Sequence, residues 1–285
     1  MNISFLIIFA SLVRTLPDFF LLPILRIIRT LLISLHTIRP IKFISQIQKN
    51  ISIFFSNKSS IQQRELLCNN VLHSLYTIPE CMDAWKKRKE TANNASLTGT
   101  ELLKKSVERG KGTIVVAFHT ANLEIGFYIL NSLYPSYCTY QINNNRTIAD
   151  AQYSYRKGYA LGAIQSHQLK TIISLLKQNQ ICWIAPDQGK HTKHGIVSAS
   201  FFNISIPTLT IVSRLATFTK STVLIMLCGR NNQCMRKHEV SFHWYGTGDT
   251  ISHNLLDEAN RLNTFLEMQV NAYPDQYLWS YRIVK

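Results

Sequence analysis

The stretch TIVVAFHTANLEIGFYIL, residues 113–130, indicates the fold of the chain around it. Its β-branched run TIVV, residues 113–116, predicts a buried strand that ends close to His119. From about Asn122 the apolar residues take up a helical spacing, so a helix is expected to follow. His119 is therefore expected in the connection that leaves the carboxyl end of the strand.

Glu124 follows His119 by five residues and stands at the expected start of the helix. Five helical residues would place the two side chains on different faces, whereas a loop position lets the His119 ring fold back to the carboxylate. Glu124 would then hold one ring nitrogen while the other accepts a proton from an alcohol. Alternatively, His119 belongs to the core and Glu124 is favoured by the helix dipole. The spacing alone favours this second interpretation.

Strands and helices are predicted to alternate along most of the chain. The expected strands are residues 113–116, 136–142, 181–185, 222–227 and 238–244. The expected helices are residues 59–90 with a break at Pro79, 98–111, a helix from about 122, 147–159, 167–178, 207–218 and 255–272. This alternation predicts an α/β fold with helices flanking a mixed sheet.

Asp187, like His119, follows a predicted strand. Ligands of open α/β sheets gather beyond the carboxyl ends of the strands, so these two residues are expected to share one rim. Arg156 lies between them in the sequence and can hold a carboxylate ionised or bind a phosphate. The alternatives are a turn residue for Asp187, in the segment PDQG, and a solvated helix face for Arg156.

The composition is basic and apolar. The 285 residues include 31 Lys and Arg and 16 Asp and Glu, which gives a net charge of +15, and 46% of them are hydrophobic. Such a charge suits nucleic acid, anionic lipid, phosphorylated ligands or an acidic protein. Because no recognisable module of basic and stacking aromatic residues is present, we expect no nucleic-acid partner.

Other functional motifs are missing from the sequence. It contains no Walker loop, no G-x-G-x-x-G, no H-E-x-x-H and no G-x-S-x-G. His191 and His194 have the spacing of a metal pair, but they lie in a basic loop with no obvious third ligand. Six scattered cysteines without C-x-x-C predict free thiols in a reducing compartment. We therefore expect no metal and no cofactor.

The first 40 residues indicate a membrane anchor, with the remaining domain at 41–285. Apolar runs are interrupted by arginines and prolines, so no clean stretch of about 20 apolar residues forms. One possibility is an imperfect spanning helix near residues 3–25. The other, which we favour because of the prolines and arginines, is a set of amphipathic helices in the headgroup layer. Residues 1–64 carry eight basic residues against one acid, Asp18, which suits anionic lipid.

Six blocks, in order along the chain, resemble the late acyltransferases of lipid A biosynthesis, a family of glycerolipid-type acyltransferases. HTANLE, residues 119–124, is similar to the family's H-x-G-N-W-E, with Ala121 and Leu123 as departures. The other five are RKG at 156–158, WIAPDQ at 183–188, FF with Pro207 and Thr208, SRLA at 213–216, and YPDQYLWSYR at 273–282. Asn203 stands where that family usually has Gly.

This resemblance implies a glycerolipid acyltransferase-like sheet and a set of site residues. It implies that His119 is the general base and that Glu124 orients it, with no acyl-enzyme. Arg156 and Asp187 would be a supporting pair that shapes the site or binds a phosphate or the phosphopantetheine arm. Asn122 and Gln188 match the family at positions expected to bind substrate or support the site. A backbone N–H group or Arg156 would stabilise the oxyanion.

The resemblance also implies substrates and a location. The acyl donor would be acyl carrier protein, and the acceptor a hydroxyl on a hydroxyacyl chain of a phosphorylated lipid A precursor. The protein would bind membrane lipids at the cytoplasmic face of the bacterial inner membrane, as a single-pass or monotopic protein. Two alternatives are an acyltransferase acting on another glycolipid or a lysophospholipid, and a non-enzymatic basic adaptor. The four residues His119, Glu124, Arg156 and Asp187 together argue against the adaptor.

Overall fold

The computed structural model describes residues 16–85, 89–141, 153–189, 194–231 and 234–284. The first part of the expected anchor and most of the loop 190–194, including His191, lie outside these residues, as does the first part of the helix expected at 147–159.

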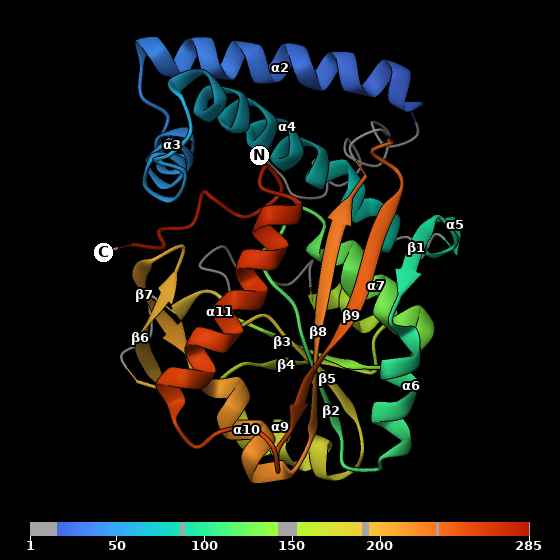
Figure 1. Ribbon diagram of the computed structural model, residues 1–285. Helices are drawn as coiled ribbons and strands as arrows, with labels where there is room; N and C mark the ends of the chain where they lie inside the picture. The colour runs from blue at the N-terminus through green and yellow to red at the C-terminus, as the bar shows by residue number, and fades with distance from the viewer. Residues whose placement is uncertain (1–15, 86–88, 142–152, 190–193, 232–233, 285) are drawn as a thin grey trace.

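A seven-stranded sheet forms the centre of the molecule (Figure 1). Its strands, in spatial order, are β1 (Ala95–Thr98), β9 (His238–Thr247), β8 (Thr222–Arg230), β2 (Thr113–Val116), β5 (Ile181–Ile184), β3 (Tyr137–Tyr140) and β4 (Gly162–Gln165). Only the pair β8 and β9 is antiparallel. The prediction of an α/β fold with a mixed sheet flanked by helices is confirmed.

Both faces of the central strands are buried, which explains their unbroken apolar sequences. In β2, Ile114 and Val116 point into one core cluster, whereas Val115 packs in the other. The first cluster also contains residues of α3 (Lys42–Phe54), α9 (Leu169–Lys177), α10 (Ile211–Thr219) and α11 (Leu255–Ala272). The second contains residues of α6 (Thr100–Glu108) and α7 (Leu123–Leu133). The helices therefore cover the sheet on both sides.

Two long helices lie beyond the carboxyl ends of the parallel strands. Figure 1 shows α2 (Asp18–Ile38) running across the top of the molecule, with α4 (Ser60–Trp85) directly beneath it. A short helix, α5 (Lys89–Asn93), follows α4. In the described part of the chain α2 is the one helix long and apolar enough to cross a membrane.

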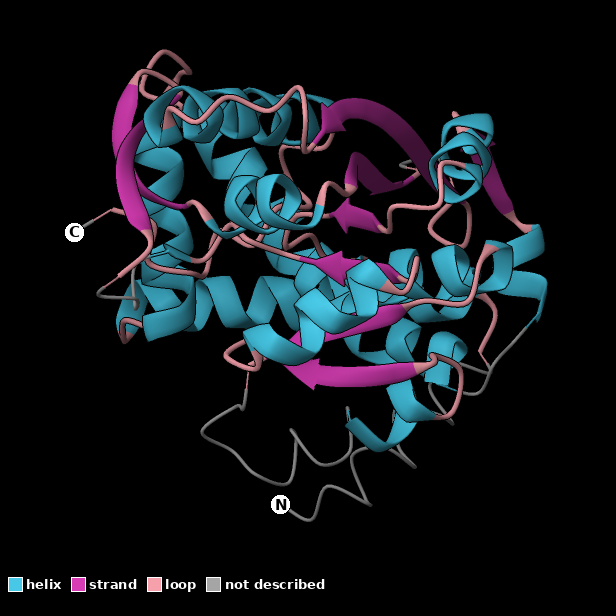
Figure 2. Ribbon diagram, turned by 90° about the horizontal axis from the view of Figure 1, so that it is seen from below, coloured by secondary structure: helices cyan, strands magenta, loops and turns pink. Residues whose placement is uncertain are grey.

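The two-stranded sheet of β6 (Ile196–Phe201) and β7 (Ile204–Leu209) stands apart from the large sheet, as Figure 2 shows. Its turn holds Phe202 and Asn203, both in the left-handed region with φ of 49° and 59°. Such a turn favours Gly or Asn, which explains why Asn203 substitutes for the family's glycine.

Several expected elements are found, and two expectations are wrong. The strand at 113–116 and the helix at 255–272 match β2 and α11. The break at Pro79 is wrong, because α4 continues through it. The helix expected from Pro207 is wrong at its start: Pro207 lies in β7 and α10 begins at Ile211. Proline is tolerated in β7 because this small sheet has no central strand. Strands β1, β4, β6 and β7 were not predicted.

Candidate active site

Strand register brings His119 and Asp187 together. β2 and β5 are parallel neighbours, with Thr113 opposite Ile181 and Val116 opposite Ile184. His119 and Asp187 each follow the last residue of their strand by three positions, so they leave the sheet side by side. The expectation that they share one rim agrees with this geometry.

Asp187 holds both the ring and the backbone of His119. Its Oδ1 lies 2.6 Å from Nδ1 of His119, and its Oδ2 accepts a hydrogen bond of 2.9 Å from the His119 backbone N–H. The Asp187 side chain is 2% exposed, whereas that of His119 is 25% exposed. The carboxylate is therefore sealed inside the protein, while the imidazole reaches the surface of the site.

The charge on Asp187 determines which nitrogen of His119 carries the proton. Burial alone would raise the pKa of this carboxyl, but the charge and hydrogen bonds of His119 bring it below its ordinary value of 3.8. Asp187 is thus ionised at neutral pH and only accepts hydrogen bonds. Nδ1 must then be the donor, which leaves Nε2 of a neutral imidazole free to accept a proton. No described residue hydrogen-bonds to Nε2.

Glu124 pairs with Arg156 instead of His119. The guanidinium contacts both carboxylate oxygens: Nε donates to Oε2 at 3.2 Å and Nη2 donates to Oε1. Glu124 is 8% exposed and Arg156 is 5% exposed. Burial would lower the pKa of Arg156, but the charge of Glu124 raises it overall, so the guanidinium stays protonated. The hydroxyl of Tyr159 also approaches Glu124 Oε2, at 3.4 Å.

The expected pairings of the four residues are therefore wrong. The sequence predicted a His119–Glu124 hydrogen bond and a separate Arg156–Asp187 pair; the structure forms His119–Asp187 and Glu124–Arg156. The physical reason is that Asp187 is placed by the strand next to β2. Glu124, in the first turn of α7, reaches the short helix at 153–157 that carries Arg156.

The two remaining predicted residues have different environments. Asn122 is 1% exposed, and its Oδ1 accepts a hydrogen bond of 2.9 Å from the hydroxyl of Thr120. Its amide nitrogen donates to Sγ of Cys228 in β8 at 3.2 Å. Asn122 therefore links the connection between β2 and α7 to the central sheet. Gln188 is half-buried immediately after Asp187.

The sequence did not identify Tyr277 as a site residue. Its hydroxyl lies 3.1 Å from Asp187 Oδ2, and the tyrosine itself is 3% exposed. The block YPDQYLWSYR contained the signal, since it matched a family segment with no assigned role. The sequence alone did not indicate that Tyr277 lies beside Asp187, which stands 90 positions earlier.

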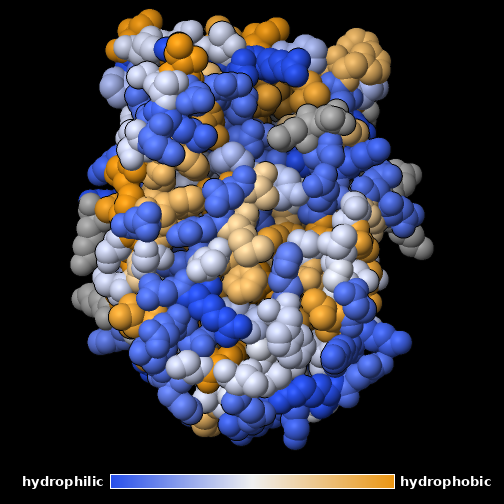
Figure 3. Space-filling model, in the orientation of Figure 1, coloured by the Kyte–Doolittle hydropathy of each residue, from blue (hydrophilic) through white to orange (hydrophobic). Residues whose placement is uncertain are grey.

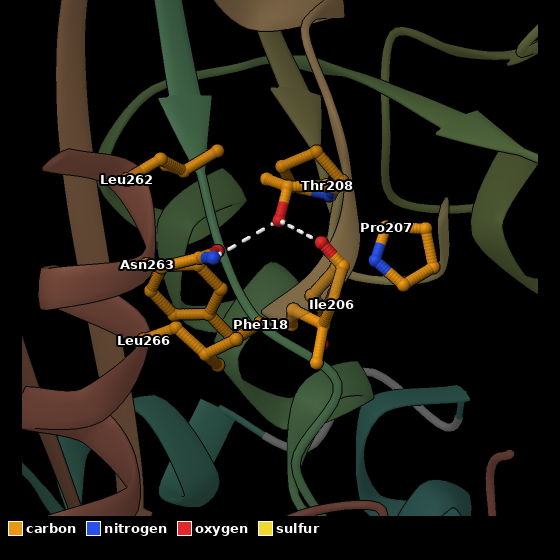
Figure 4. Close-up of a pocket in the computed structure, with 9 residues that line it drawn as sticks. Phe118, Ile206, Pro207, Thr208, Leu262, Asn263 and Leu266 are labelled. Carbon is orange, nitrogen blue, oxygen red and sulfur yellow. Dashed lines mark hydrogen bonds between the residues drawn. The ribbon is translucent and has the colours of Figure 1, made fainter. Parts of the chain in front are cut away.

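A narrow cavity lies next to Asp187 (Figure 4). Its volume is about 10 Å³, which is the space of roughly one water molecule. Its lining is mostly apolar, with Ile206 from β7 and Leu262 and Leu266 from α11. Across it, the amide of Asn263 donates to the hydroxyl of Thr208 at 2.9 Å, which ties α11 to β7 (Figure 4).

Metal-binding groups and disulfide bonds are both absent among the described residues. Within the ranges that the structure covers, no three His, Cys, Asp or Glu side chains form a group that could hold a metal ion. All six cysteines are free.

Comparison with known proteins identifies relatives of this chain. The sequence model of the family described as bacterial lipid A biosynthesis acyltransferase matches residues 1–285. The lipid A biosynthesis palmitoleoyltransferase of Escherichia coli is 24% identical over 246 residues, which cover 84% of this chain and 77% of that protein. The lipid A biosynthesis lauroyltransferase of the same organism is 24% identical over 254 residues, covering 84% and 78%.

One solved structure is also similar. The 1-acyl-sn-glycerophosphate acyltransferase PlsC from Thermotoga maritima is 15% identical with a TM-score of 0.39. The match covers 79% of this chain and 93% of that one.

Proposed function

Because this chain belongs to the bacterial lipid A biosynthesis acyltransferase family, we propose that it moves a fatty acyl group from acyl carrier protein to a hydroxyl of a lipid A precursor. Family membership makes it an acyltransferase of lipid A biosynthesis. The donor, the acceptor hydroxyl and the roles of individual residues are our proposal. The observation that carries it is the His119–Asp187 pair at the ends of two neighbouring strands.

His119 is the general base in this proposal. Its Nε2 takes the proton of the acceptor hydroxyl while that oxygen attacks the thioester carbonyl carbon. A C–O bond forms and the C–S bond breaks, so the carrier leaves as a thiolate that regains a proton from the imidazolium. No covalent acyl-enzyme is required, because the acceptor oxygen itself is the nucleophile.

Asp187 is the group that orients the base. Its contacts with Nδ1 and with the backbone N–H fix the ring and favour the imidazolium that forms during the reaction. Glu124 then acts indirectly: with Arg156 it forms a buried ion pair that holds the start of α7 against the short helix at 153–157. Since the guanidinium of Arg156 is occupied by Glu124, a backbone N–H group is favoured as the oxyanion donor.

The charge of the protein supports the proposed substrates. A net charge of +15 attracts both an acidic carrier protein and a phosphorylated lipid. Long-range attraction of this kind raises the rate of encounter more than it raises affinity.

The amino-terminal segment supports a monotopic location at the cytoplasmic face of the inner membrane. Helix α2 exposes a row of apolar side chains at helical spacing: Phe20, Ile24, Ile27, Leu31, Leu35 and Ile38. Figure 3 shows apolar side chains at the upper edge of the molecule, where α2 lies. The amino-terminal end of α2 is tied to the folded domain, because Asp18 accepts hydrogen bonds from Tyr76 and Arg236. Near its other end, Nε2 of His36 lies 3.4 Å from Oε1 of Gln48 in α3.

This attachment favours a helix lying in the headgroup layer over a spanning one. In the same proposal, residues 1–40 form the anchor and 41–285 the acyltransferase domain.

The proposal is tested with purified protein, acyl carrier protein donors of several chain lengths and a tetra-acylated lipid A precursor. We expect acyl transfer by the wild type and none by His119→Ala, with both variants folded and membrane-bound. Wild-type activity in His119→Ala would refute the base assignment. Transfer to a lysophospholipid but not to the lipid A precursor would instead favour the alternative acceptor.

A further inference from the structure

The carboxyl-terminal segment, residues 273–279, lies across the His119 loop. The Leu278 backbone N–H donates to the His119 carbonyl at 2.9 Å, and the Ala121 N–H donates to the Gln276 carbonyl at 2.7 Å. Thr120 and Tyr277 form an isolated antiparallel bridge between these contacts. The loop that carries His119 is thus paired to the segment as one strand is paired to another.

Within this segment Tyr277 reaches the carboxylate that holds His119. Burial, followed by the charge of Asp187, raises the pKa of Tyr277 well above its ordinary value of 10, so its hydroxyl remains protonated. It therefore donates to Oδ2 of Asp187, at 3.1 Å. Oδ2 also accepts the His119 backbone N–H, and Oδ1 is left for the ring nitrogen.

The segment itself is rigidly held. The amide of Asn70, in α4, donates to the carbonyls of Asp275 and Tyr277, each at 2.8 Å. Gln276 makes two hydrogen bonds of 2.7 Å with the backbone of Arg230 at the end of β8. Trp279 is fully buried, and its ring lies 5.6 Å from that of Phe54. These contacts fix the Tyr277 hydroxyl from several sides.

We propose that Tyr277 is a positioning residue for the acyl transfer: it fixes Asp187 Oδ2 so that Oδ1 faces Nδ1 of His119. The inference rests on the proposed role of His119 as the base. A hydroxyl at this position prevents rotation of the carboxylate away from the imidazole, and the paired segment keeps the His119 backbone in place.

Tyr277→Phe removes this hydroxyl alone, and Tyr273→Phe is its matched control. Tyr273 lies in the same segment, and its hydroxyl also donates to a carboxylate, Oε2 of Glu239, at 2.6 Å. We expect kcat of Tyr277→Phe to fall about tenfold, the factor typical of one hydrogen bond to a charged group. KM for both substrates should stay unchanged, and Tyr273→Phe should keep the wild-type kcat.

Two further readouts separate positioning from general support of the fold. If Tyr277 acts through Asp187, Tyr277→Phe should change kcat less than about twofold in an Asp187→Asn background. In protein labelled with ¹⁵N-histidine, the ring N–H resonance of His119 should shift in Tyr277→Phe and stay in place in Tyr273→Phe.

The possible outcomes decide the inference. A wild-type kcat in Tyr277→Phe with an unmoved His119 resonance overturns it, and so does equal loss of activity in the two phenylalanine variants. Loss of folding in Tyr277→Phe alone would make the residue structural and also overturn it. Failure of the proposed function is recognised separately: either the wild type would transfer no acyl group to the lipid A precursor, or His119→Ala would remain as active as the wild type, whatever the result at Tyr277.

Discussion

His119 and Asp187 keep the same sequence separation, 68 positions, as the paired residues of β2 and β5. The register of the two strands therefore continues into the loops that leave them. A base and its carboxylate placed this way need no long connecting loop to meet. Their geometry is as rigid as the sheet, which suits a site that must hold an imidazole in one orientation.

Replacing each of the two buried carboxylates by its amide tests which of them orients His119. We expect Asp187→Asn to lower kcat by about a hundredfold or more, because the imidazole loses its orienting charge. Glu124→Gln should lower kcat less once activity is corrected for the fraction of folded protein, since Glu124 pairs with Arg156. Steady-state kinetics at matched folded fractions measures both. A larger loss of kcat in Glu124→Gln than in Asp187→Asn would instead assign Glu124 as the partner of His119.

The buried Glu124–Arg156 pair makes a prediction about stability. Arg156→Met should lower the free energy of unfolding by about 3–5 kcal/mol, because it removes the guanidinium that balances the buried charge of Glu124. The double variant Glu124→Leu with Arg156→Met should recover most of this loss, since it removes both charges. Denaturant unfolding in detergent provides the measurement. Equal destabilisation in the single and double variants would show that packing, and not the unbalanced charge, is responsible.

The lowered pKa of Asp187 also predicts how the free energy of unfolding depends on pH. Burial would raise its pKa, but His119 lowers it below 3.8, so the native protein holds this proton less tightly than the unfolded chain. The stabilisation is then complete above about pH 3.8 and is lost as the pH falls through the native pKa. We expect the difference in unfolding free energy between the wild type and Asp187→Asn to be present above about pH 3.8 and to shrink as the pH falls below it.

Asp249→Asn is the control for this acid titration. Asp249 makes ion pairs with Arg109 and Lys220, but its side chain is 54% exposed. Exposed pairs contribute little to stability, so its difference from the wild type should be small at every pH. A difference at Asp187 that grew as the pH fell below about 3.8 would contradict the assignment of an ionised, buried carboxylate.

Local patterns in the sequence were sufficient for the central strand and for the common rim of His119 and Asp187, whereas the catalytic candidates rested on the family resemblance. β2 is recognisable because its residues are buried on both faces and are all β-branched, three of them apolar. The partner of His119 was not predictable, because the order of strands in the sheet determines it. Nothing in the residues around 119 indicates that β5, rather than another strand, lies beside β2 on that side.

Tyr277 and β7 show two further limits of the sequence. The apolar and hydroxyl residues around Pro207 fit a helix start as well as a strand, and only pairing with β6 distinguishes them. Tyr277 matched a family block, but its contact with Asp187 depends on how Asn70 and Gln276 hold the chain end. Both features arise from contacts between distant parts of the chain.

The last prediction concerns the outer face of α2. Ile27 and Leu31 are 62% and 64% exposed and lie one turn apart on that face. If this face enters the headgroup layer, Ile27→Glu with Leu31→Glu should weaken binding to anionic phosphatidylglycerol vesicles by about a hundredfold, because two apolar side chains lose their burial. Lys104→Gln with Lys105→Gln makes the same change in net charge on exposed α6 residues and should bind almost as the wild type. Equal weakening in the two variants, measured by vesicle sedimentation, would assign the binding to net charge rather than to α2.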